Sequence, residues 1–394
     1  MASEPQSAPG KPPIWNDPKI RAIFFQVVAL AALIAFVLYI LNNTLSNMES
    51  RGIRAGFGFL EQSAGFGILM SLIPFTEADS FGRTFVVGLL NTILVSVLGV
   101  IVATIIGFVM GVARLSKNWL ISMLATVYIE IFRNIPLLLQ IMFWYFAVLQ
   151  AVPGPRQSFH LGESFFLNNR GLYLPAPVPE QGFWLTGIAF VIAVVAVIII
   201  ARWAHVRQER TGQQFHTVYV SIAILLGLPF LAFAIMGFPL TWDFPALKGF
   251  NFQGGMTIIP ELAGLLAALS IYTGAFIAEI VRSGILAVSH GQTEAAGALG
   301  LRTSITLRLV IIPQAMRVII PQLTSQYMNL TKNSSLATAI GYPDLVAVFA
   351  GTTLNQTGQA VEVIGMTMGV YLTLSLLISV FMNWYNKKMA LVER

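Results

Sequence analysis

Long apolar runs separated by short polar stretches dominate the 394 residues. A helix needs about 20 mainly apolar residues to cross a bilayer. Eight runs reach this length, near 22–41, 84–113, 119–149, 183–201, 217–238, 261–281, 317–340 and 361–385. The second and third are longer than a span requires, and Pro136 supplies a cause for a kink in the third. The pattern predicts an all-α integral membrane protein with about eight transmembrane helices.

Composition agrees with this pattern. Hydrophobic residues make up 56% of the chain, charged residues 10%, and the mean hydropathy is +0.76, which excludes a soluble globular protein. There are no cysteines, so disulfides, cysteine-ligated zinc and iron–sulfur centres are excluded. The histidines are dispersed among loops without ligand spacing, so no metal site is expected. They are His160, His205, His216 and His290.

The distribution of Lys and Arg predicts how the spans are oriented. Eight spans place both termini on one side, and that side carries 15 Lys and Arg against 6 on the other. Because positive charge concentrates in cytoplasmic segments, both termini are expected to be cytoplasmic. The basic residues occupy five separate inside segments rather than one patch, which argues against nucleic-acid binding.

The remaining segments contain no repeat and no evident domain boundary. Residues 1–21 are expected to form a disordered tail, and the apolar run that follows is too long for a cleaved signal peptide. Two outside loops, 42–83 and 150–182, are long. The first contains the apolar stretch Ala64–Phe75, which is too short to span and should lie at the interface or pack on the bundle.

The longest inside loop, about 283–316, contains the sequence SHGQTEAAGALG from Ser289 to Gly300. Ser289 and Gln292 fit a capping box, the Ala-rich middle favours helix, and Gly300 is placed as a terminator. These features predict a short cytoplasmic helix. Its small residues, Ala295–Ala298, would let a partner approach the backbone closely. Packing of this helix under the chain's own bundle is the alternative.

Three motifs resemble the permease subunits of binding-protein-dependent ABC importers. Glu294-Ala295-Ala296, followed by Gly300 and Ile312-Pro313, is similar to the EAA motif of that family. EIFRNIPLLLQ at 130–140 and AEIVRSGI at 278–285 resemble its polar-amino-acid branch. The motifs fall within 84–150 and 261–385, which would correspond to the five-helix core of the family.

Three further helices enlarge this core, as in the Q-type permease of general L-amino acid (Aap) importers and in related Bzt glutamate/glutamine/aspartate permeases. NDPKIRA at 16–22 and GFGFL at 56–60 carry this resemblance. The expected organisation is a tail (1–21), an accessory helix (22–41), a periplasmic loop (42–83), the first part of the core (84–150), periplasmic loops with an accessory helix pair (151–260, pair 183–238), and the second part of the core (261–385).

The resemblance implies a type I importer permease of the bacterial inner membrane that works by ATP-driven alternating access. It implies several partners: two ABC ATPase subunits that hold ATP and Mg, a second homologous permease subunit, and a periplasmic amino-acid-binding protein that delivers an L-amino acid. A heterodimer of permeases is typical of the Aap type, and a homodimer would satisfy the same motifs. The chain has no G-x-x-x-x-G-K-[ST] loop, so neither a cofactor nor a catalytic residue is expected on it. In the family the EAA helix docks into the ATPase, so the resemblance assigns this coupling to Glu294, Ala295, Ala296, Gly297, Gly300 and Leu301.

Polar residues inside spans suggest a substrate path, because a polar group facing lipid is costly. In the seventh span they recur at helical spacing along one face. Helix-to-helix hydrogen bonds, or snorkelling of Lys332 toward the interface, would explain them equally. For Asn91 a bridge to neighbouring backbone is the alternative. The candidates are Asn91, Gln140, Gln322, Gln326, Asn329, Lys332, Asn333 and Ser334.

Two acidic–basic pairs at i and i+3, Glu130–Arg133 and Glu279–Arg282, lie toward the cytoplasmic ends of spans. We interpret them as structural braces between the bundle and the inside loop rather than as substrate contacts. An ATP-independent secondary transporter or channel would explain the spans and the polar face, but not the EAA-like loop. A membrane enzyme would need a converging titratable cluster, and two ion pairs do not supply one.

Overall fold

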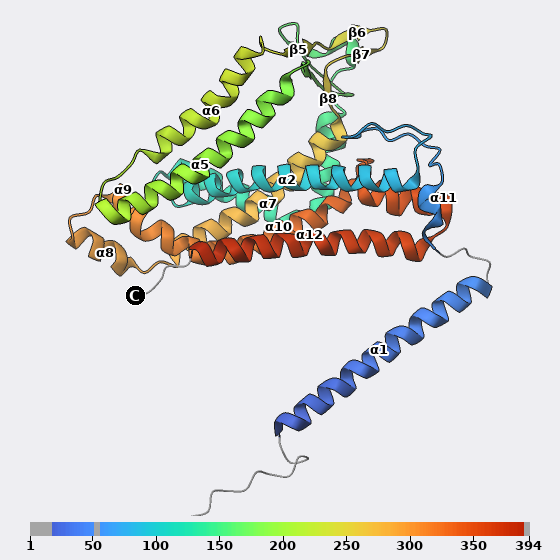
Figure 1. The fold of residues 1–394 in the computed structure, drawn as a ribbon, viewed down its shortest axis with the longest axis horizontal. Coiled ribbons are helices and arrows are strands. Elements are labelled where there is room, and N and C mark those ends of the chain that lie inside the picture. The colour runs from blue at the N-terminus through green and yellow to red at the C-terminus, as the bar shows by residue number, and fades with distance from the viewer. Residues whose placement is uncertain (1–17, 51–55, 390–394) are drawn as a thin grey trace, which may run out of the picture. The chain divides into compact units, whose positions relative to one another are not determined.

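The computed structural model describes residues 18–50 and 56–389. Helices dominate it, and seven are long and apolar enough to span a bilayer, with a bent helix pair as an eighth candidate. This confirms the predicted helical membrane protein. Most of the predicted tail, residues 1–17, lies outside the described residues, and 18–21 already belong to the first helix. The longer helices are α1 (Pro18–Ser50), α2 (Phe81–Arg114), α3 (Trp119–Asn134), α5 (Phe183–Thr211), α6 (Thr217–Ile235), α7 (Pro260–Leu286), α10 (Ile312–Asn333) and α12 (Ala360–Met389) (Figure 1).

Shorter helical segments connect or extend these helices. They are η2 (Phe57–Glu61), α4 (Leu137–Met142), η3 (Phe143–Leu149), η4 (Pro155–Gln157), α8 (His290–Ala298), α9 (Thr303–Thr306), η5 (Leu307–Ile311), η6 (Ser334–Ile340), η7 (Val346–Thr353) and α11 (Leu354–Thr357). η7 and α11 lie in a stretch, 341–359, for which the apolar pattern predicted no helix.

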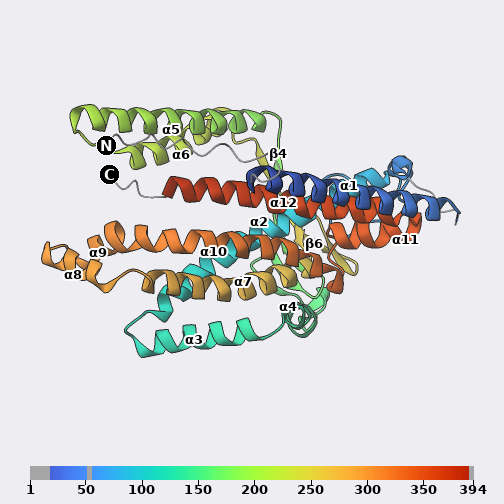
Figure 2. The same cartoon turned by 90° about the horizontal axis from the view of Figure 1, so that it is seen from below.

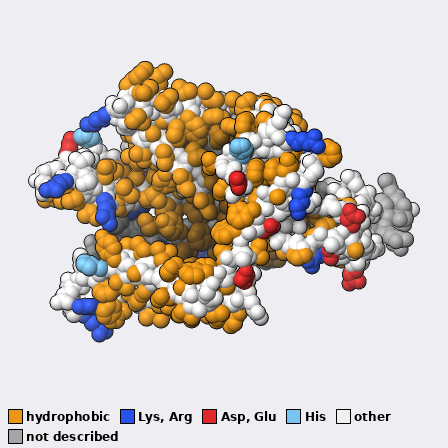
Figure 3. All heavy atoms as spheres, turned by 90° about the horizontal axis from the view of Figure 1, so that it is seen from above, with side chains coloured by type: hydrophobic (Ala, Val, Ile, Leu, Met, Phe, Trp, Pro, Cys, Tyr) orange, Lys and Arg blue, Asp and Glu red, His pale blue; other side chains and the backbone are white. Residues whose placement is uncertain are grey.

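Several long helices are apolar on all sides and exposed. In α1 every side chain from Lys19 to Asn43 is exposed, and α6 buries none of its residues. Hydrophobic side chains cover most of the face drawn in Figure 3. A helix that is apolar all round needs an apolar environment, which a lipid bilayer supplies.

The chain divides into two compact units, although its sequence shows no boundary. Of the described residues, unit 1 comprises 18–50, 56–93 and 343–380, and unit 2 comprises 94–342 and 381–389. Both divisions fall inside continuous helices, α2 and α12. No linker composition therefore marks them.

The core of unit 1 is aromatic. Phe59, Phe81 and Phe349 are buried in it, together with Ala64. Ala64 belongs to the short apolar stretch of the first loop, and that stretch therefore packs on the bundle, one of the two predicted alternatives. The loop itself is shorter than expected, because α1 continues to Ser50.

Asp344 is a fully buried carboxyl in unit 1, in the segment between the last two spans. Its Oδ1 accepts the backbone N–H of Ala347 at 2.8 Å, and the Tyr371 hydroxyl lies 3.4 Å from its Oδ2. Burial outweighs these hydrogen bonds and raises the pKa of Asp344 to about 7. The folded chain thus keeps a proton that the unfolded chain releases near pH 3.8.

This raised pKa predicts a pH-dependent stability. The free energy of unfolding should be highest below about pH 4 and should fall by about 4 kcal/mol as the pH rises through the folded pKa near 7. Asp344→Asn should flatten this slope, because an amide does not titrate. Thermal unfolding of the purified chain between pH 4 and 8 measures it. The control, Asp79→Asn at a half-buried carboxylate, should keep the fall, and a slope unchanged by Asp344→Asn would contradict the assignment.

Unit 2 is built around α7. This helix packs against α3, α4, η3 and α10, and two-thirds of its most apolar window is buried. Gly107 and Gly111 of α2 face it without side chains: a Cβ on Gly111 would lie 2.6 Å from the Ala278 carbonyl oxygen, and one on Gly107 would overlap Ile277. The two glycines form a G-x-x-x-G pair, which lets helices approach closely.

The predicted third span is broken at Pro136. α3 ends at Asn134, and the segment Leu137–Leu149 turns away from it by 108° (Figure 2). Pro136 has no N–H, and its ring disfavours helical geometry at Ile135, which is extended (φ −97°, ψ 130°). A kink was predicted here, and the turn is large enough to make two helices.

The seventh predicted span begins earlier than expected. α9, η5, α10 and η6 form one helical stretch, Thr303–Ile340, so the inside loop predicted at 283–316 is shorter at both ends. Pro313 lies in the first turn of α10, directly after the wide π-helical turn η5. A proline cannot donate to the carbonyl four residues earlier, which accounts for the altered hydrogen-bond register before it.

α5 and α6 form a helical hairpin and lie side by side in both views (Figures 1 and 2). α5 continues ten residues beyond its predicted end at 201, to Thr211, because the polar residues there extend the helix out of the apolar run. Gly212, at φ +69°, ends it with its N–H bonded to the Gln208 carbonyl.

The segments on either side of this hairpin form a small β unit, residues 154–179 and 240–258, where only loops were predicted. Its strands are too short to stand out in the sequence pattern. They are β1 (Phe159–Leu161), β2 (Phe165–Asn168), β3 (Gly171–Leu174), β4 (Ala176–Pro179), β5 (Leu240–Asp243), β6 (Ala246–Lys248), β7 (Asn251–Gln253) and β8 (Met256–Ile258).

All pairings in the β unit are antiparallel. One sheet has the order β1-β2-β3-β8, and β4-β5 and β6-β7 form two-stranded ribbons. Tyr173 and Phe252 are buried with their ring centres 4.9 Å apart, and the Tyr173 hydroxyl is 3.0 Å from Asn251 Oδ1. These contacts join the sheet to the β6-β7 ribbon.

Candidate functional site

The short helix predicted in the inside loop is α8, His290–Ala298, and it follows directly from the end of α7 (Figure 1). Its C-terminus is a Schellman motif: Gly300, at φ +72°, donates to the Gly297 carbonyl, and Leu301 donates to the Ala296 carbonyl. Gly300 is therefore the predicted terminator. A side chain at this φ would be strained, so the end of the helix depends on glycine.

The predicted capping box is wrong. The Ser289 side chain makes no cap hydrogen bond, and only its carbonyl accepts from the Gln292 N–H. The Gln292 side chain is engaged elsewhere, accepting from Gln314 Nε2 at 3.2 Å. This bond ties α8 to the start of α10, which is a contact that local sequence spacing could not indicate.

α8 buries one residue and exposes the others. Ala296 is 3% exposed, whereas Glu294, Ala295 and Gly297 are exposed, and a Cβ on Gly297 would meet nothing within 4 Å. His290 Nδ1 lies 3.0 Å from Glu294 Oε1 across one exposed helical turn. The helix thus presents a surface of very short side chains, which leaves its backbone open to a partner.

The polar face of α10 is largely exposed. Gln322, Asn329 and Lys332 are exposed, while Gln326 and Asn333 are half-buried. The adjoining face of the helix is buried and apolar, with Ile319, Ile320, Leu323 and Leu330. Packing within the described part of the chain therefore leaves Gln322, Asn329 and Lys332 uncovered.

Three other path candidates form hydrogen bonds that account for their polarity without a substrate. Asn91 is fully buried, and its Nδ2 donates to the carbonyls of Met70 (2.8 Å) and Pro343 (2.9 Å). Gln140 Nε2 donates to Phe132 and Ile135 carbonyls that the break at Pro136 leaves without helical partners. The buried Ser334 hydroxyl donates to a carbonyl one turn earlier. Their placement favours the structural alternative.

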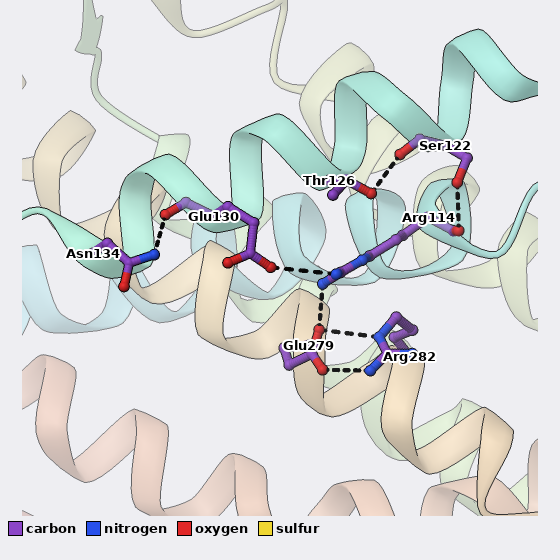
Figure 4. Close-up of polar contacts among 7 residues, drawn as sticks. All are labelled: Arg114, Ser122, Thr126, Glu130, Asn134, Glu279 and Arg282. Atoms are coloured by element: carbon purple, nitrogen blue, oxygen red, sulfur yellow. Dashed lines mark hydrogen bonds and ion pairs between the residues drawn. The ribbon is translucent and has the colours of Figure 1, made fainter.

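A charged cluster joins α2, α3 and α7 (Figure 4). Glu279 lies 2.6 Å from Arg114 Nη1 and 2.6 Å from Arg282 Nη2, and Arg114 Nη2 is 3.3 Å from Glu130. Glu279 is therefore shared between two guanidinium groups. Its side chain is 23% exposed, and those of the two arginines are 19% and 29% exposed.

The predicted partner of Glu130 is wrong. Glu130 pairs with Arg114 rather than with Arg133, whose guanidinium lies over the Phe276 ring at 5.2 Å. Arg114 was missed because 165 residues separate it from Glu279, and no local spacing reports such a pair. The Gly107/Gly111 pair was also missed, although G-x-x-x-G within an apolar run was a readable signal.

The two carboxylates bound to Arg114 should differ in their effects. Glu279→Gln is expected to lower the free energy of unfolding by about 2–3 kcal/mol, because two partly buried arginines lose their charge partner. Glu130→Gln, at a 55% exposed side chain, should cost at most about 0.5 kcal/mol. Thermal unfolding of the purified variants compares them, and equal losses would contradict the central role of Glu279.

Comparison with known proteins places this geometry in a family. Residues 210–391 match the family model described as binding-protein-dependent transport system inner membrane component. The putative amino-acid ABC transporter permease YhdX of Escherichia coli is 56% identical over 96% of this chain and 97% of its own. The general L-amino acid transport system permease AapQ of Rhizobium johnstonii is 57% identical over 96% and 94%.

A third relative matches over a similar extent and is named for a different substrate range. The glutamate/glutamine/aspartate/asparagine transport system permease BztB of Rhodobacter capsulatus is 42% identical over 96% of each chain. Identity of this extent covers the core, the α5–α6 hairpin and the β unit together. The protein therefore belongs to the family of inner-membrane permeases of binding-protein-dependent ABC transport systems.

Proposed function

We propose that this chain is the permease subunit of an importer that moves L-amino acids into the cytoplasm, with a broad preference that includes polar and charged ones. The substrates for which AapQ and BztB are named, general L-amino acids in one case and acidic amino acids and their amides in the other, support this substrate class. Transport is driven by ATP that two separate ATPase subunits hydrolyse, since the sequence has no phosphate-binding loop of its own.

The observation that carries the proposal is the surface of α8. An exposed helix with short side chains, held by Ala296 at one side and ended by a Schellman motif, suits docking into a groove of another protein. We assign ATPase coupling to this helix. The cluster around Glu279 lies on α7, whose end leads into α8, and would brace the helices that carry the coupling helix.

The substrate path follows the exposed polar face of α10. Gln322, Gln326, Asn329 and Asn333 would line it, and Lys332 would meet a substrate carboxylate. Gln322, Asn329 and Lys332 are exposed, so a second homologous permease subunit could complete the path across them. We favour a heterodimer of two related permeases, with a periplasmic amino-acid-binding protein delivering the substrate and both termini in the cytoplasm.

Reconstitution tests the proposed function. Proteoliposomes that contain this chain, a second permease and the ATPase subunits should take up radiolabelled glutamate, glutamine, arginine and leucine only with ATP inside and binding protein outside. Omission of any component should abolish uptake. Uptake by this chain alone, independent of ATP, would instead identify a secondary transporter or channel.

A further inference from the structure

The β unit carries a cluster of positive charge around one exposed aromatic ring. Arg156 Cζ lies 4.8 Å from the centre of the Phe250 ring, and Arg170 Nη1 donates to the Phe250 carbonyl at 3.1 Å. Lys248 lies two residues before Phe250, at the end of β6, where it pairs with Asn251 of β7. Phe250 itself is 75% exposed. The contacts fix both guanidinium groups beside Phe250, one at its ring and one at its backbone carbonyl.

These cations have no carboxylate partner in the part of the chain that the structure describes. No Asp or Glu oxygen there lies within 4.0 Å of Arg156, Arg170 or Lys248. The two arginines line an open hollow of about 300 Å³ together with Gln157 and Phe250. A hollow with two oriented guanidinium groups suits carboxylates, which can accept paired hydrogen bonds from them.

An apolar hollow of about 320 Å³ adjoins this one along the chain, since Gln157 lines the first and Phe159 the second. It lies over β1, β2 and β3, and its rim includes Phe159 (60% exposed) and Leu161 (77% exposed). Arginine and aromatic side chains around an apolar patch are the composition of energetically important protein–protein contacts.

The free edge of β1 indicates surroundings other than hydrocarbon. Among the described strands β1 pairs with β2 alone, and all three of its residues are exposed. Unpaired N–H and C=O groups along a strand edge cannot be satisfied in the bilayer core. A protein surface or water can satisfy them, so hydrocarbon does not cover this edge, and we take a soluble protein as the occupant.

The position of the β unit specifies the side of the membrane on which that protein binds. β8 ends at Ile258, α7 runs from Pro260 to Leu286, and α8 begins at His290. The 27 residues of α7 span about 40 Å, so the β unit and α8 lie at opposite ends of a membrane-crossing helix. A partner of the β unit therefore does not share a compartment with the ATPase.

We propose that the β unit is the docking surface for the soluble amino-acid-binding protein, with Arg156 and Arg170 binding carboxylates on that protein and the apolar hollow covered beside them. This inference rests on the proposed function, because the proposed function supplies the binding protein as the partner. It assigns a role to an insertion outside the five-helix core.

The test is the double charge reversal Arg156→Glu/Arg170→Glu in the reconstituted complex. The binding-protein concentration for half-maximal uptake should rise about tenfold or more, while the maximal rate stays near that of the parent protein. For Arg156→Lys/Arg170→Lys, this concentration should lie between that of the parent protein and that of the double reversal. The matched control is Arg202→Glu/Arg210→Glu, which reverses two exposed charges near the other end of α5 and should leave the half-saturating concentration unchanged.

A second measurement separates this inference from the proposed function. This measurement is the affinity of the same binding protein for the two permeases in nanodiscs, without ATPase. The affinity should be about tenfold weaker for the double reversal than for the parent protein. For the parent protein it should also weaken as the salt concentration rises. If the reversal variant binds the binding protein normally, and uptake still needs ATP and the binding protein, the inference is overturned and the proposed function stands. Parent complexes whose uptake needs neither component overturn the proposed function.

Two further outcomes would also overturn the inference. Loss of radiolabelled glutamate binding by the reversed permease alone would identify the hollow as a site for free amino acid. A change in uptake that depends on the anionic lipid content of the vesicles, but not on binding-protein concentration, would identify it as a lipid contact. Unfolding temperatures of all variants in detergent report whether the β unit remains folded.

Discussion

Gly297→Leu is expected to reduce ATP-dependent uptake strongly while the permease itself stays folded. Gly297 is exposed on α8, and a Cβ there would have no atom within 4 Å, so leucine meets no obstacle within this chain. Leucine also favours helix over glycine by about 0.8 kcal/mol. A stabilised helix that no longer works would mean that the space beside Gly297 is filled by a partner. We expect a loss of at least about tenfold, equivalent to about 1.4 kcal/mol of docking free energy.

Gly297→Ala is the matched control for this substitution. It raises helix propensity to a similar extent but adds a single methyl group, so uptake should remain close to that of the parent protein. Copurification of the ATPase with each variant measures docking directly. Transport by the leucine variant at the parental rate would show that this face of α8 does not contact the ATPase.

Gly111→Val should destabilise the permease severely, by about 3 kcal/mol or more. Its Cβ would lie 2.6 Å from the Ala278 carbonyl oxygen and 2.8 Å from Val281 Cβ, so α2 and α7 would have to separate. Helix backbones in a bilayer associate through close packing, and a side chain at this contact removes it. Expression level and thermal unfolding in detergent measure the effect.

Gly187→Val in α5 is the control for Gly111→Val. No atom lies within 4 Å of a Cβ at Gly187, so the same change in another apolar helix should alter stability by no more than about 0.5 kcal/mol. A comparable loss in both variants would indicate a general intolerance of valine in these helices, and would contradict the specific contact at Gly111.

Sequence patterns predicted the features that depend on local chemistry. Apolar runs located the spans, because a bilayer requires about 20 such residues, and Gly300 located the end of α8, because only glycine adopts its left-handed conformation without strain. Pro136 located the break in the third span for an equally local reason. The size of the turn there depends on what α4 packs against, and the sequence does not contain that information in readable form.

Several features that sequence patterns missed depend on residues far apart in the chain. Glu279 binds Arg114, and Gln292 binds Gln314 instead of completing a capping box. The β unit was missed because its strands are three or four residues long, too short for alternation to be recognised. The substrate path along the polar face of α10 stays a prediction, whereas Asn91 and Gln140 donate to backbone carbonyls, which hydropathy cannot distinguish from a substrate contact.

The single helix α7 has an energetic consequence for the two ends it joins. If docking at the β unit favours one position of α7, it favours the corresponding position of α8 as well, because an uninterrupted helix moves as one body. Thermodynamic linkage then requires reciprocity. The factor by which the docked binding protein raises the affinity of the ATPase for ATP equals the factor by which ATP raises the affinity of the permease for the binding protein. The affinity for the delivery protein would thus report the nucleotide state across the bilayer.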